Sequence, residues 1–378
     1  MSGADRPFTI TARDAEGRAR AGILRTAHGE VENPVLMPVA TQGSIKALSQ
    51  EDLDALGVQA ILANSYHLYL RPGAGTVAAA GGLHSFMSYR GSILTDSVCF
   101  QVLSLSGLRE VKDEGVTFRS HLDGSEHTLT PESVVALQAE LGSDIWTALD
   151  EPAEYPCTPE RARAALRRTQ RWLEASEKTF KELSARRERP ALFFPILQGG
   201  LFADLRREAA EHMAGIDHQG VSLGGFSVGE PKELTWETLS RSTEVLPQEK
   251  PRYLMGVGAP GDLWEAVNLG VDMMDCVWPT RLARNGYLLT RQGRLNITNA
   301  RFSKDFSPIE EGCPCPACRR HSRAYLCHLY KARELSAYRL LSLHNLQFTL
   351  GLMREIREAL RAGRFQEARR EFLSGEMD

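Results

Sequence analysis

Three aspartates, Asp96, Asp150 and Asp275, each close a short apolar run of the chain. Two carboxylates that face one substrate can perform glycosidic chemistry, because one attacks the anomeric carbon while the other moves a proton on the leaving group. A third carboxylate can accept hydrogen bonds from the donor edge of a purine. A single aspartate in such a position often caps the following helix instead. Three together favour a reaction centre, and they leave open whether the substrate is a sugar, a phosphate or a nucleobase.

Three cysteines within six residues form the strongest local motif of the chain. Cys313, Cys315 and Cys318 are separated by Pro314 and Pro316, a spacing that is typical of a zinc knuckle. Three thiolates leave little open coordination, so we expect a structural rather than a catalytic metal. The residues from which the fourth ligand can come are His321, His328, Cys327 and His344.

Positive charge gathers around this cysteine motif. Residues 279–335 contain eleven Lys and Arg and four Asp and Glu, a local net charge of 11 − 4 = +7 in a chain whose overall charge is −3. A solvated protein face would account for such a segment. A footprint for a nucleic-acid phosphate backbone accounts for it better, because the positive charge is concentrated in one place.

The elements that must position these groups follow from the apolar pattern. The eight runs that predict strands are 35–39, 59–63, 92–95, 144–149, 191–198, 220–223, 252–256 and 271–277. Their continuous apolar character is typical of parallel strands that are buried on both faces. Helix signals lie between them, so the chain predicts an α/β fold, specifically a (β/α)₈ TIM barrel. A Rossmann fold is disfavoured because the glycine fingerprint after the first strand is missing.

The carboxyl ends of barrel strands form the catalytic face of this architecture. The residues predicted at that edge are Ser65-Tyr66-His67, Asp96, Asp150-Glu151, Gln198-Gly199-Gly200, Gly224-Gly225, Met255-Gly256 and Asp275. Three segments start or stop like helices. A helix opens at Ser49, a second runs from Thr130 to Gly142, and a third runs from Thr158 towards Arg189, where Pro190 stops it.

The predicted domain organisation has three parts. Residues 1–285 form the barrel core, interrupted by a β-hairpin insertion near 106–129, where an alternating segment leads into Asp123-Gly124. Residues 286–345 form a zinc-binding subdomain. Residues 346–378 form a C-terminal helical segment that completes the barrel.

Composition limits the class of protein. The 378 residues are 42% hydrophobic and 25% charged, which is ordinary for a folded globular protein and excludes disorder as the main state. No apolar run approaches the roughly 18 residues of a membrane span, and the first residues lack the profile of a secretory signal. Seven cysteines, an odd number, favour a reducing compartment. We therefore expect a cytoplasmic protein without a membrane partner.

Several longer motifs identify a family. The segments ILANSYHLYLRPG, ILTDSVCFQVLSL, SLGGFSVGEP, YLMGVG, GVDMMDCVWPTRLARNG and CPCPAC, followed by His344-Asn345, resemble those of bacterial tRNA-guanine transglycosylases. The resemblance covers nearly the whole chain, from about residue 8 to 369. It implies a (β/α)₈ barrel with a zinc-binding insertion, usually a homodimer. It also implies exchange of guanine at the anticodon wobble position of tRNA for a 7-deazaguanine base, normally 7-aminomethyl-7-deazaguanine, in queuosine biosynthesis.

The resemblance assigns roles to individual residues. Asp275 resembles the nucleophile that attacks ribose C1′ and holds the RNA covalently, and Asp96 resembles the general acid/base. The positions that resemble those of the base pocket are Asp150, Gln198, Gly225 and Phe226, with Met255 and Phe100 stacking on the base.

The resemblance also assigns the metal and RNA contacts. It selects His344 from the candidates for a fourth zinc ligand, beside Cys313, Cys315 and Cys318, with one structural Zn²⁺ per chain. Arg281 and Arg284 resemble residues that hold the anticodon loop of tRNA.

The sequence departs from the family at three places near the base pocket. Val98-Cys99 replace a usual pair of glycines, Pro152 replaces a cysteine, and Phe226 stands where leucine is usual. If Val98 and Cys99 point into the pocket, catalysis should be slow, and if they point into the barrel wall it should be near normal. We expect the first arrangement, because the neighbouring Asp96 must face the substrate.

Three alternatives to that activity remain at this point. The same scaffold could accept queuine or another 7-deazapurine. It could be a weakly active or non-catalytic tRNA-binding paralogue, although such a subunit would be expected to have lost Asp275. A glycosidase of free sugars would have no use for the cysteine motif or for the positive charge near it.

Overall fold

The fold is a (β/α)₈ barrel. A computed structural model describes residues 6–105 and 109–375. The barrel strands are β4 (Val35–Pro38), β5 (Ala60–Ala63), β6 (Ser92–Thr95), β10 (Ile145–Thr147), β11 (Leu192–Phe194) with β12 (Ile196–Leu197), β13 (Val221–Leu223), β14 (Arg252–Leu254) and β15 (Met273–Cys276). The eight predicted strand runs are confirmed. Adjacent strands pair in parallel, β15 pairs with β4, and a bridge between Val39 and Leu62 joins β4 to β5. Pro195, which has no N–H for a ladder bond, separates β11 from β12.

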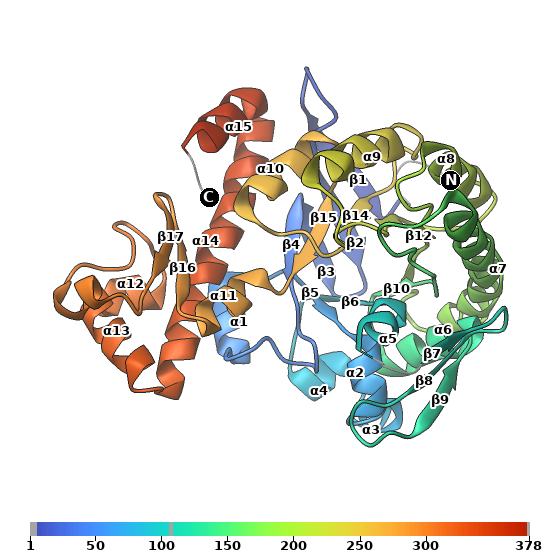
Figure 1. The fold of residues 1–378 in the computed structure, drawn as a ribbon, viewed down its shortest axis with the longest axis horizontal. Helices are drawn as coiled ribbons and strands as arrows, with labels where there is room; N and C mark the ends of the chain where they lie inside the picture. The colour runs from blue at the N-terminus through green and yellow to red at the C-terminus, as the bar shows by residue number, and fades with distance from the viewer. Residues whose placement is uncertain (1–5, 106–108, 376–378) are drawn as a thin grey trace.

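Helices surround these strands as the βα rhythm predicts. Those that follow barrel strands are α1 (Gln50–Leu56), α2 (Ser65–Leu70), α3 (Ala74–Ala79), α4 (Leu83–Met87), α5 (Cys99–Leu105), α6 (Pro131–Leu141), α7 (Pro159–Ser184), α8 (Ala203–Met213), α9 (Lys232–Glu244) and α10 (Pro260–Asn268). In Figure 1, α6 to α10 form an arc around the strands. The capping signals are confirmed: the Ser49 and Thr130 side chains both cap helices, and Gly142 ends α6 in the left-handed conformation.

The long helix α7 is shorter than predicted, because it ends at Ser184 and not near Arg189. The Ser184 hydroxyl accepts a hydrogen bond from the backbone N–H of Ala191 at 3.0 Å. The Arg187 guanidinium donates to the carbonyl of Ser143 at 2.7 Å. Tertiary hydrogen bonds thus hold the segment after Ser184 in a non-helical path towards β11.

A three-stranded antiparallel sheet precedes the barrel and was not predicted from the sequence. It consists of β1 (Phe8–Arg13), β2 (Arg20–Thr26) and β3 (Gly29–Asn33). The Arg20 guanidinium forms two hydrogen bonds with Asp272, at 2.8 and 2.6 Å, and the His28 ring bonds Asp144 at 2.6 Å. Both aspartates immediately precede barrel strands. The sheet therefore covers the amino-terminal end of the barrel and leaves the other end for chemistry.

The insertion after α5 is a small antiparallel sheet of β7 (Arg109–Val111), β8 (Val116–Arg119) and β9 (Glu126–Leu129). The predicted hairpin is confirmed: β8 pairs with β9 from Val116–Leu129 to Arg119–Glu126. The first residues of the predicted insertion, 106–108, lie outside the described part of the chain.

The cysteine motif lies in a separate group of elements after β15. These are α11 (Trp278–Arg284), β16 (Tyr287–Thr290), β17 (Gly293–Asn296), the 3₁₀ helix η1 (Ala300–Lys304), α12 (Pro316–Arg320), α13 (Arg323–Lys331), α14 (Leu335–Arg361) and α15 (Phe365–Ser374). In Figure 1, α14 runs between the barrel and the orange elements β16, β17, α12 and α13. The predicted boundary at residues 345 and 346 falls inside α14. Among the described residues, no helix is long and apolar enough to span a membrane.

Candidate active site and metal centre

The three aspartates gather at the carboxyl ends of the barrel strands. Asp275 lies in β15, Asp96 directly follows β6, and Asp150 lies three residues beyond β10. All three side chains are buried, with exposed fractions between 4 and 9%. Carboxylates so removed from water depend on hydrogen bonds from the protein, and each of the three has its own set of donors.

Asp275 receives two hydrogen bonds on the same oxygen. The Tyr253 hydroxyl and the backbone N–H of Gly256 donate to Oδ1 at 2.6 and 2.8 Å. Burial raises the pKa of Asp275, and these two donors act against that shift. Tyr253 lies in β14, which pairs with β15 through Tyr253 and Met273. Tyr253 was not predicted as a site residue, because a hydroxyl in an apolar strand gives no sign of which carboxylate it contacts.

Asp96 is held by the segment that follows β5. The Asn64 amide donates to Oδ2 at 2.5 Å, and the Ser65 backbone N–H donates to Oδ1 at 2.8 Å. Burial raises the pKa of Asp96 to about 6, and the charge of Asp275 adds to the rise. The two carboxylates are therefore close enough to influence one another. Ser65 was expected at this edge, and the role of Asn64 was not foreseen.

Asp150 and Gln198 form one hydrogen-bonded unit. The Asp150 carboxylate accepts from the Ser97 hydroxyl and from Gln198 Nε2, both at 2.6 Å. Burial raises the pKa of Asp150 to about 6, and the charge of Glu151 also raises it. Gln198 Oε1 is buried and has no partner among the described residues. The unit thus offers a carboxylate and an amide oxygen to a ligand that carries N–H groups.

The other predicted pocket residues differ in exposure, and one of them, Gly225, lies against Gln198. Gly225 has a φ of +73°, and a Cβ there would lie 2.7 Å from Gln198 Oε1, so no larger residue fits without displacing the amide. Phe100 lies on α5 with 52% of its surface exposed, whereas Phe226 is buried. Met255 follows β14 and is half-buried. The exposed surface of Phe100 and the half-buried Met255 are thus open to contact with a ligand.

Val98 and Cys99 do not take the arrangement that we expected from the sequence. Both side chains are fully buried and belong to the hydrophobic cluster that includes Val116 and Phe118. They therefore pack into the wall of the fold and do not narrow an open pocket. Val98 has a φ of +67°, which is rare for a β-branched residue. The backbone N–H of Val98 acts to lower the pKa of Asp96, so the turn at Val98 helps to stabilise the ionised carboxylate.

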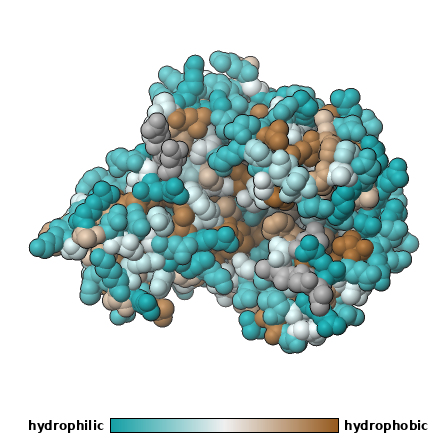
Figure 2. Space-filling model, viewed as in Figure 1, coloured by the Kyte–Doolittle hydropathy of each residue, from teal (hydrophilic) through white to brown (hydrophobic). Residues whose placement is uncertain are grey.

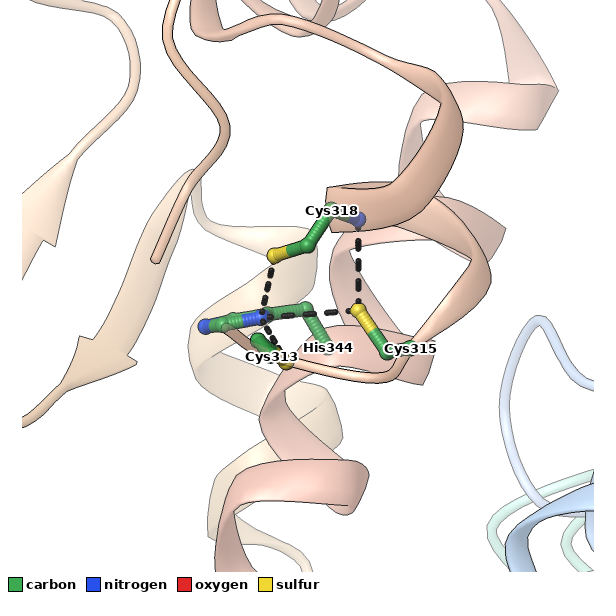
Figure 3. Close-up of side chains that lie close together, drawn as sticks. All are labelled: Cys313, Cys315, Cys318 and His344. Carbon is green, nitrogen blue, oxygen red and sulfur yellow. Dashed lines mark hydrogen bonds between the residues drawn. The ribbon is translucent and has the colours of Figure 1, made fainter. Parts of the chain in front are cut away.

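The predicted zinc ligands converge on one point (Figure 3). His344 Nδ1 lies 3.7, 3.7 and 3.3 Å from the sulfur atoms of Cys313, Cys315 and Cys318. Tetrahedral zinc with ordinary bond lengths separates a sulfur and a nitrogen ligand by about 3.6 Å. His344 Nε2 bonds the Leu289 carbonyl at 2.7 Å, which orients the ring as second-shell partners of metal ligands do. The four residues fit a structural zinc ion.

The positive segment is partly neutralised by ion pairs. Arg291 pairs with Glu355, and Arg323 pairs with Asp305 at 3.1 Å. Figure 2 shows that the left end of the molecule, where this segment lies in Figure 1, is mainly hydrophilic and that hydrophobic residues gather towards the middle of the face.

The two arginines with an expected RNA contact lie on α11, directly after the strand that carries Asp275. Arg281 is exposed and Arg284 is half-buried. Burial lowers the pKa of Arg284, and the charge of Arg281 acts in the same direction. Arg284 Nη1 is buried without a partner among the described residues, which is the state expected of a donor that awaits a ligand acceptor.

Comparison with known proteins shows the family of the chain. A family model described as "Queuine tRNA-ribosyltransferase" matches residues 14–377. A queuine tRNA-ribosyltransferase of Pelotomaculum thermopropionicum is 52% identical over 366 residues, which cover 97% of both chains. Another of Caldanaerobacter subterraneus subsp. tengcongensis is 50% identical over 366 residues, or 97% of this chain and 96% of that protein. The chain therefore belongs to the queuine tRNA-ribosyltransferase family.

Proposed function

We propose that this protein is a tRNA-guanine transglycosylase that exchanges guanine at the anticodon wobble position for a 7-deazaguanine base. We propose 7-aminomethyl-7-deazaguanine as the incoming base, in queuosine biosynthesis. The observation that carries the proposal is the meeting of three separately hydrogen-bonded, buried carboxylates at the carboxyl end of the barrel. The names of the most similar relatives support the same reaction class.

In the first half-reaction Asp275 is the nucleophile. Because Tyr253 and Gly256 both donate to Oδ1, Oδ2 is the oxygen that attacks ribose C1′. A C1′–O bond forms as the C1′–N9 bond breaks, and the electron pair of that bond leaves with guanine. The guanine takes a proton from Asp96, whose pKa of about 6 suits a group that gives and takes protons near neutral pH.

In the second half-reaction Asp96 removes a proton from the incoming base, whose ring nitrogen attacks C1′ and releases Asp275. Asp150 and Gln198 Oε1 accept hydrogen bonds from the N–H groups of the base, and the Gly225 backbone lies beside them. Phe100 and Met255 stack on its faces. The reaction is a ping-pong exchange, so water must be kept from the intermediate.

The partners follow from the same proposal. Arg281 and Arg284 hold the anticodon loop of tRNA next to Asp275, and one zinc ion per chain stabilises the subdomain that follows. We propose a homodimer, as the resemblance implies, and Phe306 and Leu335 in that subdomain, each 81% exposed, offer apolar surface to a second copy. We propose a cytoplasmic location, where unmodified tRNA is available.

The test is exchange of labelled guanine into unmodified tRNA, repeated with 7-aminomethyl-7-deazaguanine, queuine and other 7-deazapurines. The wild-type protein should form a protein–RNA adduct that resists denaturation. Asp275→Asn should form none and still bind tRNA, because it removes the attacking oxygen and preserves the shape of the side chain. An adduct that persists in Asp275→Asn would contradict the assigned nucleophile. Binding of tRNA without any exchange by the wild-type protein would identify a non-catalytic paralogue.

A further inference from the structure

A buried arginine lies beneath two of the strand ends that form the base pocket. Arg206, on α8, is 1% exposed. Its guanidinium donates to three backbone carbonyls: that of Gly200 at 2.8 Å, that of Gly224 at 2.9 Å and that of Leu197 at 3.4 Å. The Leu197 carbonyl belongs to the last residue of β12, the Gly200 carbonyl lies three residues beyond it, and the Gly224 carbonyl directly follows β13. One side chain thus ties together two segments that are far apart in the sequence.

These two segments carry residues of the base pocket. Gln198 directly follows Leu197, and Gly225 directly follows Gly224. A shift of either backbone would therefore move the amide that bonds Asp150 or the glycine beside that amide. The hydrogen bonds of Arg206 fix both backbones from below.

The packing around Arg206 leaves little freedom. A Cβ on Gly199 would lie 2.9 Å from the Arg206 backbone nitrogen and 3.1 Å from its Cγ. A Cβ on Gly225 would lie 3.2 Å from Arg206 Nη2. Because the two glycines approach different parts of Arg206 so closely, the position of this residue limits where both segments can lie.

Arg206 also lacks the partner that a buried arginine usually has. Across residues 6–105 and 109–375 no carboxylate forms an ion pair with it. Burial lowers its pKa to about 9, and only the charge of Glu230 acts against this shift. Burying an unpaired cation is costly, and here hydrogen bonds to carbonyls and one aromatic ring offset that cost.

The aromatic ring belongs to Phe226, the second residue after Gly224. The Arg206 guanidinium carbon lies 4.1 Å from the centre of the Phe226 ring, within the range of a cation–π contact. A leucine at this position could pack against the guanidinium but would supply no such attraction. The aromatic side chain of Phe226 therefore helps to fix the Arg206 guanidinium.

We propose that Arg206 is a positioning residue of the base pocket, which holds the Gln198 and Gly225 segments in register, and that Phe226 fixes its guanidinium through the cation–π contact. This inference rests on the proposed base exchange. Arg206 acts through the segments that it ties together, and it has no role in binding the phosphate backbone. Its loss should therefore weaken recognition of the base and leave the affinity for tRNA unchanged.

The experiment compares Arg206→Lys and Arg206→Met with a matched control. Arg252→Lys is that control, because Arg252 is also buried and donates to carbonyls, those of Gly270 and Leu246, but lies at the start of β14, away from the pocket. Lysine keeps the charge of Arg206 and loses the planar fork of donors. Both Arg206 variants should raise the KM for free guanine about ten- to hundredfold and leave the KM for tRNA within about twofold, with the larger rise in Arg206→Met.

Phe226→Leu tests the cation–π contact with Arg206 independently. In the wild-type background it should raise the KM for guanine about two- to fivefold. In the Arg206→Met background the same substitution should change that KM less than twofold, because the cation is already gone. Circular dichroism and bound zinc confirm that each variant is folded. If Arg206→Met does not fold, Arg206→Lys and Phe226→Leu still decide the outcome.

Three results would overturn the inference. An Arg206→Lys variant that raises the KM for guanine no more than Arg252→Lys does would assign Arg206 to stability alone. An equal rise in the KM for tRNA would place its effect outside the base pocket. If the wild-type protein exchanges no guanine, the proposed function fails, and calorimetric binding of guanine replaces KM as the measure. A wild-type protein that binds no guanine, or Arg206 variants that bind it as well as wild type, would then overturn the inference as well.

Discussion

Val98 combines two properties that rarely occur together, a φ of +67° and a fully buried β-branched side chain. In this backbone conformation the Cβ of an L-residue crowds the following carbonyl oxygen, at a cost of about 1–2 kcal/mol. Val98→Gly removes the crowding together with the buried carbons. Val98→Ala removes most of the same carbons and keeps the crowded Cβ. A comparison of the two variants therefore isolates the strain.

The expected difference between the two variants is small. Relative to alanine, glycine loses one more buried carbon, worth about 0.8 kcal/mol, and costs about 0.5–1 kcal/mol in backbone entropy. Release of about 1–2 kcal/mol of strain offsets both losses. We therefore expect the free energies of unfolding of Val98→Gly and Val98→Ala to lie within about 1 kcal/mol of one another.

Val134 provides the matched control, because it is fully buried in the regular helix α6. There glycine should be less stable than alanine by about 2 kcal/mol, the sum of one buried carbon and the helix penalty of glycine. The assay is urea unfolding at saturating zinc, with equal slopes required for the comparison. If the glycine–alanine gap at Val98 equals the gap at Val134, then Val98 is unstrained and the reasoning is refuted.

Three further predictions concern the carboxylates, the metal and the RNA. Because burial raises the pKa of Asp96 to about 6, the folded state holds this proton more tightly than the unfolded chain does, and ionised Asp96 destabilises the fold at higher pH. Asp96→Asn should therefore abolish turnover but raise the free energy of unfolding above pH 6 by at most about 3 kcal/mol. Calorimetry should show that this gain shrinks towards pH 4. A gain that is independent of pH would contradict the raised pKa of Asp96. His344→Ala should lower bound zinc and folded yield together, whereas His321→Ala should keep its zinc, and equal metal content in the two variants would mean that the ligand set is wrong. Charge reversal at Arg281 or Arg284 should raise the KM for tRNA far more than that for the base, and the wild-type advantage should shrink as salt rises; an unchanged KM for tRNA would assign these arginines to structure.

The barrel could be predicted from the sequence because its strands are continuous apolar runs, and the N-terminal sheet could not be, for a physical reason. The strand β3, with the sequence GEVEN, has one apolar side chain, Val31. The strand β3 is stabilised by its pairing with β2. The sheet is stabilised in turn by contacts with distant strand ends, such as that of Arg20 with Asp272. Local periodicity does not record such long-range contacts. The early end of α7 at Ser184 has the same origin, because it depends on hydrogen bonds to residues outside the helix.

In the candidate site, too, some features could be predicted from the sequence and others could not. The aspartates could be predicted at the barrel edge because each one closes an apolar run. Their donors, Tyr253 and Asn64, could not be assigned, because partner choice depends on how neighbouring strands are aligned. The prediction for Val98 and Cys99 was wrong for a related reason: a positive φ at Val98 turns the chain, so that these two side chains point into the hydrophobic cluster while Asp96 keeps its own hydrogen bonds.

The continuity of α14 has a consequence for the order in which the protein can assemble. This single helix carries the zinc ligand His344 on its earlier turns and packs against β1, β2 and β4 of the N-terminal half. During synthesis the barrel strands all leave the ribosome before α14 does. The wall of the barrel that α14 covers therefore stays open until the cysteine segment has also emerged. Zinc binding and the packing of α14 on the barrel therefore both occur late in synthesis. A nascent chain deprived of zinc should keep that wall of the barrel exposed to chaperones for longer.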